Sequence, residues 1–154
     1  MESPAVLDLE SLSGEKLRRL DGNLFSYRTF RDIYWDNPES FVLDCFDWTG
    51  PDLPTTYQLE CVAALREKNR LAVRGPHGLG KTTIAAWIVL WFALTRDGLD
   101  WKIITTASSW RQLTKFLWPE IHKWVRAARW QLIGRTQPLE KRELLDLSLK
   151  LTTG

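Results

Sequence analysis

Eight consecutive residues have types and spacing that suit phosphate chemistry: Gly75-Pro76-His77-Gly78-Leu79-Gly80-Lys81-Thr82. They match the pattern G-x-x-x-x-G-K-[ST], which forms a phosphate-binding loop. Gly75 and Gly80 are expected to adopt positive φ and to let the backbone approach a polyphosphate. Lys81 would contact the β- and γ-phosphates, and the Thr82 hydroxyl would coordinate a bound Mg²⁺. The pattern therefore predicts a site for ATP with Mg²⁺.

Three further residues are expected at the same site: Gln58, Arg74 and Thr83. A glutamine carboxamide has both a donor and an acceptor, so Gln58 has the groups needed to read the N6 and N7 edge of adenine. The ordinary alternative is a solvated glutamine at the start of a helix. Arg74 and Thr83 flank the loop on its two sides, so both are counted with the nucleotide-binding residues.

A basic region follows the loop. Residues 101–135 carry seven bases against one acid, a net charge of +6, whereas residues 1–60 carry twelve acids against five bases, a net charge of −7. Such asymmetry suggests a face that meets an anionic partner. The candidates for DNA contact or mechanical coupling are Arg111, Lys115, Lys123, Arg126 and Arg129. A solvated or subunit-facing surface explains these charges equally well, because the tryptophans of this region are expected on its apolar stripe.

The helices and strands that position these residues are predicted from the spacing of apolar residues and from capping and proline residues. Apolar runs predict strands at 70–74, 101–107 and 144–151, and a helix at 83–95 between the first two. Strand, helix and strand of these lengths predict a right-handed parallel crossover, and hence an α/β fold with a mostly parallel sheet flanked by helices. Further helices are expected at 8–20, 39–45, 55–68 and 110–130. Thr55 or Thr56 would cap the third of these, and Pro119 would kink or split the last.

Composition places the chain among ordinary globular proteins. Its 154 residues make one domain's worth of chain, with 44% hydrophobic residues and nine tryptophans. Residues 1–50 are expected to form a helical or irregular arm and an aromatic, acidic lead-in, and residues 51–154 the nucleotide-binding part. Cys45 and Cys61 fit no disulfide framework or metal motif, so free thiols are expected. No signal peptide or membrane-length apolar run is present, so a cytoplasmic protein without membrane association is expected.

Three stretches together resemble the ATPase domain of phage large terminase subunits, the motors that package viral DNA. These are Val73 to Thr82, which resembles the Walker A loop; Tyr57-Gln58, which resembles the adenine motif; and Ile103 to Gln112, which resembles the following strand with its T-A-x-x-x-R-Q pattern. The resemblance covers residues 41–154. It implies a P-loop ATPase that couples hydrolysis to translocation of double-stranded DNA, within a ring of identical subunits. A small terminase subunit and a portal protein would be its partners.

The terminase pattern also contains a hydrophobic strand ending in Asp-Glu, which holds Mg²⁺ and activates water. The nearest match here is Leu144-Leu145-Asp146, with only two apolar residues before the acid. The resemblance therefore implies an incomplete ATPase domain that binds ATP without hydrolysing it alone. Two alternatives stay open: a helicase-type nucleic-acid ATPase, and a nucleotide-dependent binding or assembly module without turnover. A small-molecule kinase fits less well, because the basic helix would have no role in it.

Overall fold

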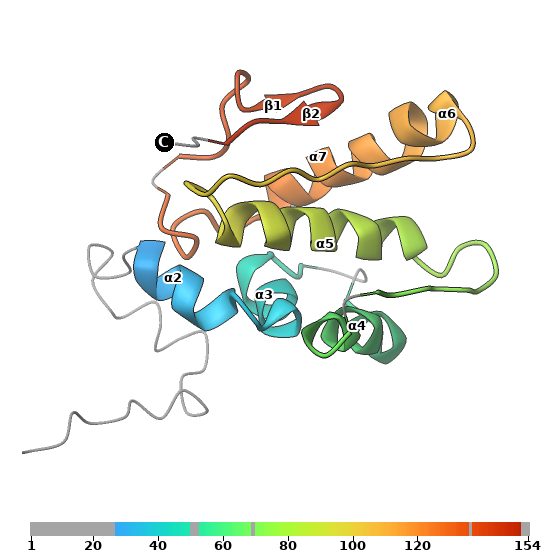
Figure 1. Cartoon of the computed structure of the whole chain (residues 1–154), viewed down its shortest axis with the longest axis horizontal. Coiled ribbons are helices and arrows are strands. Elements are labelled where there is room, and N and C mark those ends of the chain that lie inside the picture. The colour runs from blue at the N-terminus through green and yellow to red at the C-terminus, as the bar shows by residue number, and fades with distance from the viewer. Residues whose placement is uncertain (1–26, 50–52, 69, 136, 152–154) are drawn as a thin grey trace, which may run out of the picture.

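A long apolar helix, α5 (Lys81–Thr95), lies at the centre of the structure (Figure 1). The computed structural model describes residues 27–49, 53–68, 70–135 and 137–151. Nine of the fifteen residues of α5 are buried, because its sequence is apolar on almost every side. Such a helix must be covered by other elements all round. The rest of the described chain accordingly packs around α5.

Three helices cover one side of α5: α2 (Tyr27–Tyr34), α3 (Pro38–Cys45) and α4 (Thr56–Ala63). A 3₁₀ turn, η2 (Ala64–Arg66), extends α4. The α2 helix is attached through the Trp91 indole, whose Nε1 donates to the carbonyl oxygen of Tyr34 at 2.6 Å. Aromatic rings fill the space between these helices, and Phe30, Phe41 and Phe46 are completely buried. The aromatic lead-in is thus part of the core.

The other side of α5 is covered by one irregular helical rod. It consists of α6 (Trp110–Gln112), the π-helical turn η3 (Leu113–Leu117) and α7 (Trp118–Ala127). The end of α7 is joined to the end of α3 by an antiparallel bridge between Phe46 and Ala128. Two backbone hydrogen bonds flank this bridge: Asp47 N–H to Ala127 O and Arg129 N–H to Cys45 O, each 2.8 Å. The aromatic lead-in and the basic region are therefore joined directly by backbone hydrogen bonds.

Four aromatic side chains form the centre of the packing. The Trp87 ring lies 5.6 Å from the Trp48 ring and 5.2 Å from the Trp124 ring, centroid to centroid. Trp124 is also 5.1 Å from Phe46. Their tilted and edge-to-face arrangements are those that aromatic quadrupoles favour. This cluster explains part of the unusual tryptophan content, since it joins α5 to α7 and to the chain after α3.

The expected parallel α/β sheet is wrong. The sheet of the described residues is a two-stranded antiparallel hairpin, β1 (Leu144–Leu145) with β2 (Ser148–Leu149), and the rest is mostly helical. Residues 71–75 and 101–105 do alternate between partly buried and exposed positions, as strands would. Neither segment, however, makes a backbone ladder with another described segment. Alternation identifies the two faces of an extended run, but a strand also needs a neighbour for its backbone groups.

The helix predictions fare better. The helices expected at 39–45, 55–68 and 83–95 are present as α3, α4 with η2, and α5. The rod expected at 110–130 is interrupted, but at the π turn immediately before Pro119, and Pro119 itself stands in the first turn of α7. The strand expected at 144–151 is a short hairpin instead. The weak helix expected at 8–20 lies outside the described residues. Within the described chain, no helix has both the length and the apolarity to cross a bilayer.

Candidate nucleotide-binding site

The loop before α5 has the backbone that close approach to phosphate requires. Gly78 and Gly80 have φ of +85° and +73°, in the left-handed region that other residues rarely adopt. The prediction for Gly80 is therefore confirmed, and Gly78 shares its conformation. The positive φ expected at Gly75 is wrong. A Cβ at Gly75 would lie 3.0 Å from Leu79 Cδ1, the tip of an exposed side chain that has room to move, so a small side chain at this position would need only a small shift of Leu79.

Lys81 points its ammonium group back into the loop. Its Nζ donates to the carbonyl oxygens of Gly75 at 2.7 Å and Pro76 at 2.5 Å. These bonds place a positive charge inside the loop, at the N-terminal end of a fifteen-residue helix. First-turn amides of a helix lack intrahelical acceptors and carry the positive end of its dipole. Gly80, at the N-cap, has no side chain that could cap these amides. The arrangement is suited to an anion with several oxygen acceptors.

Gln58 lies directly against the loop. A Cβ on Gly80 would lie 2.1 Å from Gln58 Nε2, so only glycine leaves room for this side chain. Gln58 is 9% exposed and closes a capping box with Thr55, whose backbone N–H donates to Gln58 Oε1 at 2.9 Å. The oxygen expected to read adenine is thus already engaged at the start of α4. The structure gives Gln58 a positioning role: it fixes the start of α4 against the second left-handed glycine.

A carboxylate lies beside the first turn of α5. Glu120 Oε1 accepts hydrogen bonds from Thr83 Oγ1 at 2.7 Å and from Trp124 Nε1 at 2.9 Å. Thr83 was expected to contact the nucleotide, but its hydroxyl is directed to α7 instead. Thr82 is exposed, and so its hydroxyl is accessible for the expected Mg²⁺ contact. Glu120 connects the helix that begins at the loop to the basic rod.

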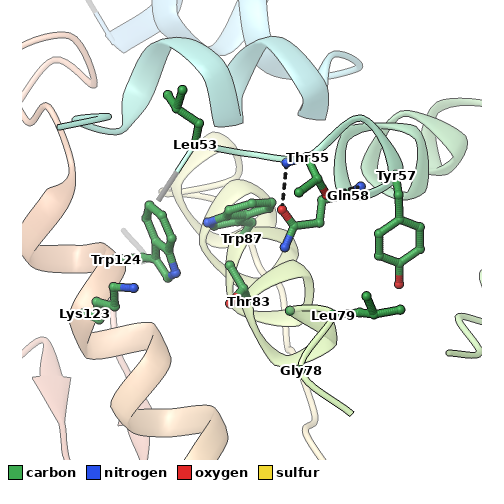
Figure 2. A pocket seen from close by; sticks show the side chains of 11 residues that line it. Leu53, Thr55, Tyr57, Gln58, Gly78, Leu79, Thr83, Trp87, Lys123 and Trp124 are labelled. Atoms are coloured by element: carbon green, nitrogen blue, oxygen red, sulfur yellow. Dashed lines mark hydrogen bonds between the residues drawn. The ribbon is translucent and has the colours of Figure 1, made fainter. Parts of the chain in front are cut away.

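Between these elements lies a cavity of about 260 Å³, shown in Figure 2. Aromatic, polar and loop residues surround it: Leu53, Thr55, Tyr57, Gln58, Gly78, Leu79, Gly80, Thr83, Trp87, Lys123 and Trp124. The indole N–H of Trp87 is buried and has no hydrogen-bond partner among the described residues. Burial and the neighbouring Cys61 thiol raise the pKa of Tyr57, whose phenol is neutral at physiological pH even without this shift. The cavity therefore combines aromatic walls with neutral donors and the basic side chain of Lys123, next to the loop of residues 75–82.

The link through Glu120 predicts energetic coupling between Thr83 and Glu120. Thr83→Val and Glu120→Gln should be non-additive in the free energy of unfolding, with a coupling of about 0.5–3 kcal/mol, because Thr83→Val removes the donor of this bond and Glu120→Gln replaces its charged acceptor by a weaker neutral one. Urea denaturation of the parent, both single variants and the double variant measures this coupling. Thr82→Val combined with Glu120→Gln is the matched control, and that pair should be additive. Additivity in both pairs would contradict the link.

The remaining loop residues lie on the surface. The side chains of Arg74, Pro76, His77 and Leu79 are exposed, so they border the loop rather than build its interior. Asp146 occupies the exposed turn between β1 and β2, since Leu145 pairs with Ser148. It directly follows β1, but β1 is a two-residue strand of an antiparallel hairpin and not the parallel strand at whose end a metal-holding acid was expected. In the described part of the chain, no group of three or more His, Cys, Asp or Glu residues is arranged to hold a metal ion. Thr82 is the protein group that fits Mg²⁺ here, and phosphate oxygens and water commonly supply the remaining ligands.

The five basic candidates separate into two groups. Arg111, Lys115, Lys123 and Arg126 have exposed side chains. Arg129 is used structurally: it pairs with Asp47 at 3.6 Å and donates to the carbonyl oxygen of Asp44 at 3.4 Å. Arg129 therefore helps to hold the bridge between α3 and α7. The tryptophans of this region were expected mostly on the apolar stripe, and Trp118, Trp124 and Trp130 are buried there, but Trp110 is 69% exposed and Phe116 is 58% exposed.

Sequence reasoning missed Glu120, Trp87 and Trp124 as parts of the site. Glu120 did carry a signal, since it is the single acid among the seven bases of residues 101–135. A single acid in a basic region suggests a specific hydrogen-bond partner, and the Thr83 hydroxyl is such a partner. Nothing in the sequence indicated that the two tryptophans would border a cavity as well as the core. Comparisons with protein-family models, with curated proteins and with solved structures gave no match.

Proposed function

We propose that the protein binds ATP with Mg²⁺ through residues 75–82. The observation that carries this proposal is the position of the Lys81 ammonium, which lies inside a glycine-containing loop at the start of a long helix. There it is held by two neutral carbonyl oxygens. Bonds from an ammonium to charged phosphate oxygens are stronger than bonds to carbonyls. A polyphosphate therefore offers better acceptors than the loop's own backbone does.

Each part of the site has a distinct task in this proposal. The left-handed Gly78 and Gly80 shape the loop so that backbone amides face the phosphates. Lys81 neutralises charge on the terminal phosphates, and the exposed Thr82 hydroxyl supplies one ligand to Mg²⁺. Bound Mg²⁺ would supply charge neutralisation at the phosphate oxygens. Gln58 keeps α4 against Gly80, so the nucleoside end of the ligand meets an ordered wall.

A wider role in DNA handling rests on the resemblance to large terminase subunits and on one observation. Four basic side chains of residues 110–127 are exposed, and Glu120 is the single acid in that segment. We propose that ATP binding serves work on DNA, as in a packaging motor with a small terminase subunit and a portal protein as partners. A reducing compartment such as the cytoplasm suits the free thiols of Cys45 and Cys61.

Calorimetric titration tests nucleotide binding directly. MgATP should bind with one site per chain, and saturating it at about 100 times its Kd should stabilise the fold by about 2.7 kcal/mol. AMP should bind much more weakly, because it lacks the β- and γ-phosphates that would contact Lys81 and the loop amides. Equal binding of ATP and AMP, or no heat with either, would contradict the proposal.

A further inference from the structure

The α6–η3 segment of the helical rod has exposed residues of unusual composition. Its exposed members, here called the α6–η3 face, are Trp110, Arg111, Gln112, Lys115 and Phe116. Two are aromatic, two are basic and none is acidic. The inward side of the same segment is formed by Leu113 and Leu117, which pack against the core. The rod is thus amphipathic, but its outer side is not the polar surface that an amphipathic helix usually presents to water.

The exposure of the two aromatic rings is large. Trp110 is 69% exposed and Phe116 is 58% exposed, although six other aromatic side chains in the described chain are less than 5% exposed: Phe30, Tyr34, Phe41, Phe46, Trp87 and Trp124.

 Those six rings belong to the core, whereas Trp110 and Phe116 are largely exposed to solvent. Exposed aromatic surface on a folded chain commonly marks a binding site.

The π-helical turn contributes to this exposure. In a regular α-helix, residues three apart share a face, so Phe116 would lie near Leu113 on the inward side. In η3 the helix is wider, and the backbone N–H of Trp118 donates to the carbonyl oxygen of Leu113, five residues earlier. The additional residue in the turn moves Phe116 outward while Leu113 and Leu117 keep their contact with the core. Turns of this kind are frequent at functional sites.

The charge around the two rings is uniformly positive. Arg111 and Lys115 are exposed next to Trp110 and Phe116 in the sequence, and residues 101–119 contain no Asp or Glu. Aromatic rings interleaved with basic side chains are the combination by which proteins bind single-stranded nucleic acid: bases stack on the rings, and the cations follow the phosphates. A duplex fits this face less well, because its bases are already stacked on one another.

We propose that the α6–η3 face binds single-stranded nucleic acid, with unpaired bases stacked on Trp110 and Phe116. Arg111 and Lys115 contact the adjacent phosphates. This site is separate from the nucleotide loop, and its residues are absent from the lining of the cavity beside that loop. DNA and RNA share the chemistry of stacked bases and phosphates, so either strand type satisfies the proposal.

Fluorescence anisotropy of labelled oligonucleotides tests the proposal on the full chain. The probes are a thymidine 15-mer, a uridine 15-mer and a 15-base-pair DNA duplex. Trp110→Ala and Phe116→Ala should each weaken binding of a single strand by about 5- to 140-fold, which corresponds to about 1–3 kcal/mol per stacked base. Leu145→Ala removes an exposed apolar side chain from the hairpin and is the matched control, which should bind like the parent.

Salt dependence provides a second, independent readout. Arg111→Gln and Lys115→Gln should each lower the slope of log K against log salt by about 0.7, the value for one phosphate contact with a single strand. A preference between the DNA and RNA strands would identify the natural ligand. Unchanged affinity in both aromatic variants, tighter binding of the duplex, or self-association of the parent that Trp110→Ala abolishes would each overturn the proposal.

Discussion

Replacing Lys81 with alanine should abolish most of the affinity for MgATP. Removing one partner of a hydrogen-bonded charge pair costs about 2–5 kcal/mol, which corresponds to a loss of roughly 30- to 4000-fold in affinity. The large effect follows from geometry, because the Lys81 ammonium is already held inside the loop by Gly75 and Pro76. Isothermal titration calorimetry of the parent and the variant with MgATP measures the change.

The control for Lys81→Ala must separate lost binding from lost structure. The thermal midpoint of the nucleotide-free variant should stay close to that of the parent, since Lys81 is only partly buried and its bonds lie within one loop. Lys68→Ala, which removes an exposed lysine after α4, should bind MgATP as the parent does. Equal MgATP affinity in the parent and in Lys81→Ala would show that residues 75–82 do not bind phosphate.

Trp87→Ala should cause the largest loss of stability, about 3–5 kcal/mol, the cost of removing a large aromatic side chain from a packed core. Trp87 is 1% exposed, and its ring contacts both Trp48 and Trp124. Since single domains are stable by only about 5–15 kcal/mol, this variant would lose a large part of the total. Urea denaturation followed by circular dichroism provides the free energy of unfolding.

Two further variants make this prediction specific. Trp87→Phe keeps a ring in the cluster and removes the buried N–H that has no partner among the described residues, so its cost should be well below that of alanine. Trp110→Ala removes an equally large side chain from the surface, and such changes usually stay within about 0.5 kcal/mol. Similar losses in Trp87→Ala and Trp110→Ala would show that the cluster is not the centre of the packing.

The helices could be predicted from the sequence because their signals are local. The start of α4 depends on Thr55, whose side chain accepts a hydrogen bond from the backbone N–H of Gln58. The position of α5 follows from Gly80, since its left-handed backbone ends the loop and the apolar run begins at once. Capping and apolar periodicity act within a few residues, so the sequence displays them directly.

The strands could not be predicted in the same way. Residues 71–75 and 101–105 alternate in burial as strands do, but neither segment forms a backbone ladder with another described segment. Pairing depends on residues distant in the sequence, and period-two alternation contains no information about them. The parallel sheet was inferred from the order of elements alone, and that inference was wrong.

The sequence by itself determined the glycine-containing loop of residues 75–82, the helix that follows it and the basic character of residues 101–135, because these depend on residue type and short spacing. Only the tertiary structure decided which groups meet. It engaged Gln58 in a cap against Gly80, joined Thr83 to Glu120 across 37 residues, and assigned Arg129 to Asp47. It also turned Trp124 into the core and left Trp110 exposed, fourteen residues earlier in the same rod. Which side chains contact one another depends on how the helices pack around α5. That packing depends on the whole chain and not on any single stretch.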